Sequence, residues 1–253
     1  MALQIGDTLG GGVGRAFTYS GAVLMALLFV YQVIFTVAVD SLLLRYLPEA
    51  ATESGQFALS APIPPAVAGG LVVLGLLFGA VLYLVAARAL TREREALGSL
   101  PAALFTRRIG RATLSAVGAN LVVGVAVSIG FVLLVVPGVY LAISFLFAVF
   151  VVGVEDERAV DALRRSWALA GGNRWRLLAL VAVVTVATAV ASSVASALSL
   201  VSPAAGELLS LAVSAVLIVI GYGTLAEAYL RLADEPGGGE GAGAPAPDAD
   251  PAA

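Results

Sequence analysis

The chemistry open to this chain is limited first by the side chains that it lacks. Among its 253 residues there is no histidine and no cysteine, and all fourteen basic residues are arginines. Histidine is the usual general base and metal ligand, cysteine is the usual thiol nucleophile, and lysine forms Schiff bases. We therefore expect no catalytic residue, no metal site and no cofactor, and we favour a protein that is not an enzyme.

Polar side chains inside long apolar segments define one candidate cavity. Gln32, Thr36 and Asp40 are spaced four residues apart, so they share one face of a helix. Asn120 and Glu227 are the other members of this set. Ionisable residues in such segments often line a solute path. The alternative is that the stripe forms hydrogen bonds between helices, each contributing about 0.6 kcal/mol, with Asp40 wetted at the outer interface.

A membrane-embedded hydrolase or transferase would need clustered carboxylates for proton transfer. Asp156, Asp161 and Glu227 are the acids that could supply them. Their spacing matches no known signature, and accidental matches to such patterns are common. We keep this as a third hypothesis.

A second candidate site combines basic and aromatic side chains. Two tryptophans are interleaved with four arginines, and the set is Arg164, Arg165, Trp167, Arg174, Trp175 and Arg176. Guanidinium groups bind phosphate oxygens through paired hydrogen bonds, and tryptophan prefers the depth of lipid headgroups. We expect contact with anionic lipid or with a protein partner. The alternative is that these charges only orient the chain in the membrane.

Helices in a lipid bilayer must position all of these residues. The chain is 60% hydrophobic and 12% charged, with a mean hydropathy of +1.00, which is too apolar for one soluble core. A span needs about 20 apolar residues. The sequence predicts six spans, arranged as three helical hairpins in an all-α membrane domain over residues 1–231. They cover residues 16–44, 67–87, 177–200 and 208–230, with two more in the run 112–154.

The arginines predict the topology. Thirteen of the fourteen fall in alternate connections between the apolar runs, and Arg45 is the exception. Because cytoplasmic loops carry the excess of basic residues, we expect a multi-pass cell-membrane protein with both termini cytoplasmic. A single span over 112–154 would place two arginine-rich connections on opposite sides, which favours two spans. No cleavable signal peptide is expected, since the first apolar run is too long for one.

Short helices are expected in the two inner connections. Over residues 100–109, Ser99 is the predicted N-cap and Pro101 the first residue. Over residues 158–170, the predicted apolar face is Val160, Leu163, Trp167 and Ala170. Gly172 and Asn173 should end that second helix. We interpret residues 3–15 as a degenerate third copy of these inner amphipathic segments. We expect its glycine run to be a flexible entry to the first span rather than a phosphate-binding loop.

Three further features complete the expected architecture. Pro137 and Gly138 predict a tight outer turn, because proline lacks an amide donor and glycine tolerates sharp turns. Gly75 and Gly79 predict close helix packing within the chain, with homodimerisation as the alternative. Residues 232–253 carry five acids and no base in a Gly/Pro/Ala-rich stretch, which predicts a disordered cytoplasmic tail.

One segment carries a family resemblance. It comprises Pro137-Gly138-Val139-Tyr140, Glu155, Ala162-Leu163 with Ser166-Trp167, and Gly172-Asn173-Arg174-Trp175-Arg176. Over residues 130–180 the chain resembles a broad group of six-span membrane proteins, many of unknown function. That group includes archaeal families and the membrane domain fused to some glycerophosphoryl diester phosphodiesterases. The resemblance implies the fold and a structural role for Pro137, Gly138, Ser166, Gly172 and Trp175, and it implies no catalysis here. The lysine-free composition also suggests an archaeal source.

These observations favour a non-enzymatic scaffold or accessory subunit. Its expected partners are membrane lipids, and a membrane-protein partner or a second copy of the chain is possible, whereas nucleic acid is not expected. The alternative is a transporter or channel for a small solute or lipid. Convergence of the candidate cavity residues on one path would favour transport, and scattered contacts between packed helices would favour a scaffold.

Overall fold

The computed structural model describes residues 4–48, 57–199 and 202–234, and these ranges contain helices and no strand. Among the described residues, six helical segments are long and apolar enough to cross a membrane. They are α2 (Tyr19–Leu43), α4 (Pro65–Leu90), α6 (Ile109–Leu133), the segment Val135–Val154, the part Arg174–Ala191 of α10, and α11 (Pro203–Ala233). The all-α class and the number of long apolar helices are therefore confirmed for these residues.

Shorter elements connect or interrupt the long helices. A helix that precedes the first long one, α1, covers Ile5–Ala16. The fourth apolar segment consists of α7 (Val135–Ser144) and α8 (Ala148–Val154). The connections hold η1 (Arg94–Gly98), α5 (Ala103–Thr106) and α9 (Ala159–Ala170), and α10 covers Arg174–Ser199. The expected helix at residues 158–170 is thus confirmed.

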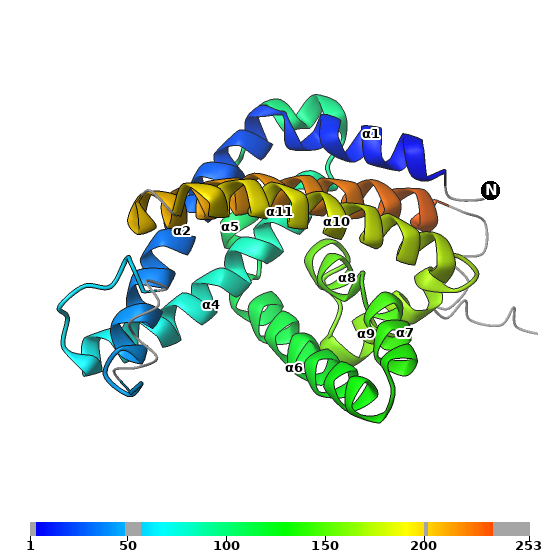
Figure 1. The fold of residues 1–253 in the computed structure, drawn as a ribbon. Helices are drawn as coiled ribbons and strands as arrows, with labels where there is room; N and C mark the ends of the chain where they lie inside the picture. Colours follow the sequence, from blue (N-terminus) through cyan, green and yellow to red (C-terminus); the bar gives the residue numbers. More distant parts are fainter. Residues whose placement is uncertain (1–3, 49–56, 200–201, 235–253) are drawn as a thin grey trace, which may run out of the picture.

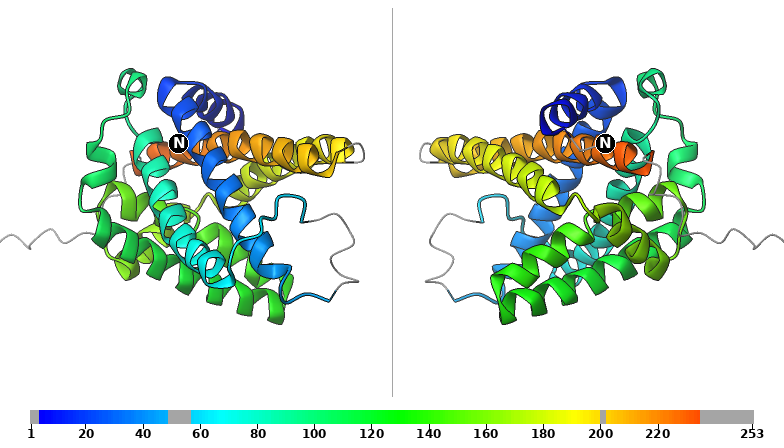
Figure 2. Two further views of the ribbon diagram at one scale, coloured as in Figure 1. Left: turned by 90° about the vertical axis from the view of Figure 1, so that its left-hand side faces the viewer. Right: turned by 90° about the vertical axis from the view of Figure 1, so that its right-hand side faces the viewer.

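The long helices pack in consecutive pairs, α2 with α4, α6 with α7, and α10 with α11. In Figure 1 the α2–α4 pair extends to the lower left and the α6–α7 pair to the lower right, while α10 and α11 cross above them beneath α1. The side views in Figure 2 show the α10–α11 pair, in yellow and orange, projecting in a third direction. The pairs therefore diverge from a shared region.

That shared region is the core of the molecule. The buried residues of α4 are concentrated in its second half, from Gly79 to Leu90. Those of α6 lie in its first half, at Ala112, Ala116 and Ala119, apart from Gly130 at the contact with α7. Helix α8 is buried over most of its length. Away from this region the helices expose apolar side chains, such as Val132 at 87%. Such exposed faces are typical of helices that lipid covers.

Glycines set how closely the pairs approach. Gly75 and Gly79 of α4 lie against the rings of Phe35 and Tyr31 of α2, so their packing is within the chain, as predicted. In the α6–α7 pair, a Cβ at Gly130 would lie 2.8 Å from the Cα of Gly138. Small residues of this kind allow backbones to come close.

The predicted turn at Pro137 and Gly138 is wrong in its position. The chain reverses at Leu134, which is extended (φ −163°) between the end of α6 and the start of α7. Pro137 instead lies in the first turn of α7, where its missing amide donor costs nothing because that donor would have no partner within the helix. Gly138 serves the close contact with Gly130 rather than a turn.

The helix predicted at residues 100–109 is reduced to one turn. Ser99 is the extended residue that ends η1, and α5 begins only at Ala103. Arg107 is extended and Arg108 is left-handed (φ 45°), so α5 cannot continue into α6. The cause is tertiary: the buried Arg88 donates hydrogen bonds to the carbonyls of Leu104 and Arg107. A continuous helix would have bonded these carbonyls internally.

Of the apolar face predicted for α9, only Ala170 is buried. Its buried residues are Ala162, Ser166, Leu169 and Ala170, whereas Val160 is 59% exposed and Trp167 is 37% exposed. Small side chains let α9 pack tightly against α8 and α6, which leaves the larger apolar groups outside. Its end is as predicted, since Gly172 takes a left-handed conformation (φ 76°).

The last long helix extends slightly further than expected. It includes Leu232 and Ala233, so the predicted limit of the membrane domain at residue 231 falls inside α11. Residues 235–253, which make up most of the predicted disordered tail, lie outside the described residues.

Candidate functional site

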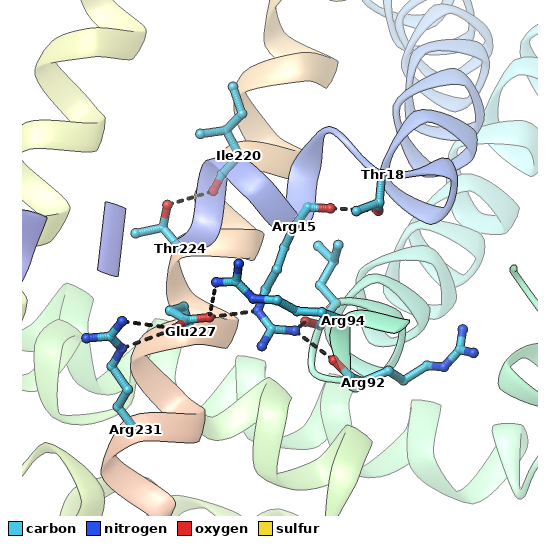
Figure 3. Close-up of polar contacts among 9 residues, drawn as sticks. Arg15, Thr18, Arg92, Arg94, Ile220, Thr224, Glu227 and Arg231 are labelled. Atoms are coloured by element: carbon cyan, nitrogen blue, oxygen red, sulfur yellow. Dashed lines mark hydrogen bonds and ion pairs between the residues drawn. The ribbon is translucent and has the colours of Figure 1, made fainter. Parts of the chain in front are cut away.

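A buried ion pair joins the first helix to the last. Arg15, near the end of α1, donates from Nε to Glu227 Oε2 of α11 at 2.8 Å, and the two side chains are 8% and 11% exposed. Its Nη1 donates to the carbonyls of Leu90 (3.0 Å) and Arg92 (2.7 Å), at the end of α4 and just beyond it. Figure 3 shows this convergence. One guanidinium thus holds α1, α4 and α11 together.

Two more arginines approach the same carboxylate. Arg231 donates to Glu227 Oε1 from Nε (3.2 Å) and Nη2 (3.1 Å), and Nη2 of the more exposed Arg94 lies 3.8 Å from Glu227 Oε2. Three positive charges therefore surround one negative charge. Glu227 was a candidate cavity residue in the sequence, but here its carboxylate is fully engaged in holding helices together.

The glycine run of α1 explains why this helix reaches the pair. A Cβ at Gly11 would lie 2.7 Å from the Glu227 side chain, and one at Gly12 would overlap the backbone of Thr224. The two glycines therefore form a flat face that lies directly on α11. The interpretation of this run as a flexible lead-in is wrong, since it is a helix with a buried contact face.

A second arginine–carboxylate cluster lies near the same end of α4. Arg88, which is 6% exposed, donates from Nε to the carbonyl of Gly153 (2.7 Å) and from Nη2 to Asp156 Oδ1 (3.1 Å). Arg107 donates to the other oxygen of Asp156 at 2.7 Å. Asp156 has a left-handed backbone (φ 56°), a conformation that aspartate tolerates better than most residues. The cluster ties α4 to the end of α8.

The acids proposed for hydrolase chemistry are all paired. Asp156 binds two arginines, Glu227 contacts three, and Asp161 lies 4.0 Å from the exposed Arg164. Arg165, one helical turn beyond Asp161, lies 3.5 Å from Glu155. Within the described residues no group of three acids could hold a metal ion. The arrangement supplies structural ion pairs at one end of the bundle.

The break in the fourth apolar segment is bridged by one hydroxyl group. Between α7 and α8 the backbone leaves helical geometry, and Ser166 of α9 inserts there. Its Oγ accepts from the amide of Phe147 (3.1 Å) and donates to the carbonyl of Ser144 (3.0 Å). Ser166 is fully buried. The side chain thus satisfies two backbone groups that would otherwise be unpaired in an apolar interior.

A third arginine sits beside this break. Arg174, at the start of α10, donates from Nε to Ser144 Oγ at 3.1 Å. Its guanidinium carbon lies 4.6 Å from the ring centre of Tyr140 and 4.8 Å from that of Trp167, so the cation is held between two aromatic faces. It forms no ion pair among the described residues. The same side chain borders a groove of about 470 Å³ between α7 and α10.

The five candidate cavity residues do not converge. Asp40 lies near the end of α2, about 30 Å along the helix from its start at 1.5 Å per residue, whereas Glu227 is held beside that start by Arg15. Asn120 is exposed on α6. Within the described part of the chain, Gln32 Nε2 and Asp40 Oδ2 are buried without a hydrogen-bond partner. Thr36 is half-buried between them.

The basic and aromatic set divides into two groups. Arg174 and Trp167 are in contact, and Trp175 borders the same groove. Arg164 and Arg176 are exposed, and Arg165 is occupied by Glu155. Asn173 contributes through its backbone, because its carbonyl accepts hydrogen bonds from the amides of Arg176 and Leu177 at the start of α10.

Sequence reasoning missed the residues that complete these clusters. Arg15 and Arg88 were counted only as topological charges, and Ser144 and Tyr140 were not given a role beside Arg174. A usable signal existed for the first two, because each arginine directly adjoins a long apolar run in the sequence, at a level where the last carbonyls of neighbouring helices need donors. Pairing across more than 60 residues, as in Arg88 with Asp156, leaves no local pattern.

The chain was compared with known families, proteins and structures. A family model, described as a domain of unknown function (DUF7847), matches residues 3–232. The match covers most of the chain, so the chain belongs to this family. Comparison with curated proteins and with solved structures finds no match. The span count, the archaeal source and the fused phosphodiesterase domains of the resembling group stay predictions.

Proposed function

We propose that this family member is an integral membrane protein that acts as a non-enzymatic scaffold or accessory subunit. In this proposal six spans form three hairpins, both termini are cytoplasmic, and the cytoplasmic end binds anionic lipid. The alternation of arginine-rich connections motivates the topology. The consecutive packing of α2 with α4, α6 with α7, and α10 with α11 supports the hairpins.

The observation that carries the proposal is that, at one end of the bundle, several carboxylates are paired with arginines while other arginines stay exposed or have no carboxylate partner among the described residues. Three carboxylates there, those of Glu227, Asp156 and Glu155, are held by arginines in structural clusters, which speaks against a role for these three groups in proton transfer. Other arginines at the same end, including Arg164, Arg174 and Arg176, remain exposed or without a carboxylate partner among the described residues. Each basic residue near an anionic membrane surface contributes about 1 kcal/mol to binding.

The transport alternative receives less support from the geometry. A path would need polar side chains that follow one another through the bundle. Here Asp40 and Glu227 lie at opposite ends, and Asn120 faces outward from α6. A protein partner or a second copy of the chain remains compatible with the scaffold role.

Purification in mild detergent, with identification of co-purifying lipids and proteins, tests the proposal. One variant changes Arg164, Arg165, Arg174 and Arg176 to glutamine. A matched variant changes four other arginines of the same end, Arg94, Arg108, Arg111 and Arg158, to glutamine. We expect the first variant to lose most of its co-purified anionic lipid and the second to lose clearly less, because only the first set is flanked by tryptophans.

Topology is checked in both variants by reporter fusions after Ala66 and after Glu157, which should report opposite sides. Equal loss of anionic lipid from the two variants would show that the basic and aromatic set has no specific role in lipid binding and only orients the chain in the membrane. Reporters on the same side of the membrane in the unaltered chain would contradict the proposal itself.

A further inference from the structure

A mostly apolar groove lies between α7 and α10. Its volume is about 470 Å³, and its apolar wall includes Val135, Val139, Ile143 and Leu178. Val135 is the first residue of α7 and Ile143 is near its end, so the wall follows the helix for about 12 Å at 1.5 Å per residue. Among the described residues that line it, Arg174 is the only charged one.

Arg174 differs from the two buried arginines of the core in what its guanidinium binds. Arg15 and Arg88 each donate to a carboxylate and to at least two backbone carbonyls. Arg174 donates only from Nε, to Ser144, among the described residues. A guanidinium has five N–H donors, so the four on its terminal nitrogens have no protein acceptor there.

The position of this cation is nevertheless fixed. The ring of Trp167 and the ring of Tyr140 contact it, and the two rings pack edge to face with centroids 5.5 Å apart. Ser144, which holds Nε, is fully buried and donates in turn to the carbonyl of Tyr140. A preorganised guanidinium loses little conformational freedom when it binds an oxyanion through two parallel hydrogen bonds.

We infer that the groove binds one anionic phospholipid, with its phosphate on Arg174 and one hydrocarbon chain along α7. Charge complementarity selects the anion, because the half-buried cation has no carboxylate of its own in the described structure. The apolar wall selects an amphiphile over free phosphate, because an amphiphile gains free energy when its methylene groups are buried in the groove and free phosphate has none to bury. This inference rests on the proposed function and names its lipid class and its site.

Native mass spectrometry of the full chain in mild detergent tests the inference. The probes are phosphatidylglycerol, phosphatidylcholine with the same chains, and inorganic phosphate. We expect one phosphatidylglycerol to bind per chain. Phosphatidylcholine has the same phosphate, but its choline cation cancels the net charge and is repelled by Arg174, so it should bind at least about tenfold more weakly. Millimolar phosphate should neither bind nor compete. The chain's two tryptophans, Trp167 and Trp175, both lie at the site, so their fluorescence gives a second readout.

Two variants act on the two halves of the site. Arg174→Gln removes the cation and should weaken phosphatidylglycerol about tenfold or more, while Arg174→Lys should recover only part of the loss. Val139→Trp fills the groove and leaves Arg174 with its contacts, so it should abolish the one-to-one complex even if Arg174→Gln folds poorly. The matched controls are Arg111→Gln and Val132→Trp, at exposed positions of α6 outside the groove, and both should bind as the unaltered chain does.

Several results would overturn the inference: equal binding of the two lipids, binding of phosphate alone, or unchanged binding in Val139→Trp. The outcome is separable from that of the proposed function. Loss of total anionic lipid in the four-arginine variant together with intact one-to-one binding in Arg174→Gln would refute the groove and leave the scaffold proposal standing.

Discussion

Arg15 and Glu227 are 212 positions apart in the chain, and their side chains meet at 2.8 Å in a buried contact. The same arginine also donates to the carbonyls of Leu90 and Arg92. Arg88 repeats the arrangement, with Asp156 as the carboxylate and Gly153 among the carbonyls. In both cases a helix-end arginine supplies donors to the last carbonyls of another helix. Such contacts hold the diverging helix pairs together at one end.

We expect Glu227→Gln to destabilise the fold strongly. Removing one partner of a buried ion pair leaves an uncompensated charge and costs about 3–5 kcal/mol, and here Arg15 is the partner that is left buried. Arg94→Gln is the matched control, since Arg94 lies 3.8 Å from the same carboxylate with a 64% exposed side chain. Its loss should cost no more than about 1 kcal/mol. Chemical unfolding in detergent measures the free energy of unfolding of both variants. Equal losses would show that the Arg15–Glu227 contact stabilises the fold no more than the Arg94 contact does.

Glycine substitutions in α1 should change stability in opposite directions. Gly12→Ala places a methyl group into the backbone of Thr224, which cannot move aside, so α1 should be pushed off α11 and the fold destabilised. Gly10→Ala meets nothing within 4 Å and should stabilise the helix by about 0.4–1 kcal/mol. Thermal unfolding, with hydrogen exchange over residues 5–16, distinguishes them. Stabilisation by both substitutions would mean that α1 does not lie on α11.

The glycine run also shows where sequence reasoning succeeds and where it stops. The six long apolar helices can be predicted from hydropathy, because a run of about 20 apolar residues is typical of a membrane-spanning helix. The contact face of Gly11 and Gly12 does not follow, because glycine permits both a flexible segment and a close helix contact. Only the neighbour, α11, decides between them, and it lies more than 200 residues away.

Ser166→Ala should cost about 1–3 kcal/mol, the penalty of leaving buried backbone groups unpaired. The amide of Phe147 and the carbonyl of Ser144 would both lose their partner at the break between α7 and α8. Ser193→Ala is the control, because among the described residues that exposed hydroxyl bonds only to its own helix, at Ala189, and its change should stay within about 0.5 kcal/mol. If unfolding in detergent shows the two alanine variants to be equally stable, the hydroxyl of Ser166 does not support the break.

The candidate site was predictable only in part. Arg174, Trp167 and Trp175 are close in sequence and have the residue types that bind phosphate and lie at headgroup depth. The groove beside them was not predictable, since it depends on where α7 begins, and Pro137 and Gly138 suggested a turn where the structure has helix. The polar stripe of α2 was correctly placed on one helix, but its supposed partners Asn120 and Glu227 lie elsewhere.

Single cysteines test the proposed topology directly, since the chain has no cysteine of its own. Leu134 is 68% exposed at the reversal between α6 and α7, and Val160 is 59% exposed on α9. We expect Leu134→Cys to react with a membrane-impermeant thiol reagent on intact cells, because the α6–α7 reversal lies on the outer side in the proposed topology. Val160→Cys should react only after the cells are permeabilised, because α9 lies in an arginine-rich connection that stays in the cytoplasm in the proposed topology. Leu146→Cys, within the fourth apolar segment, gives the level for a half-buried position in either condition. Labelling of Leu134→Cys and Val160→Cys from the same side would contradict the three-hairpin arrangement, since an odd number of spans must separate them.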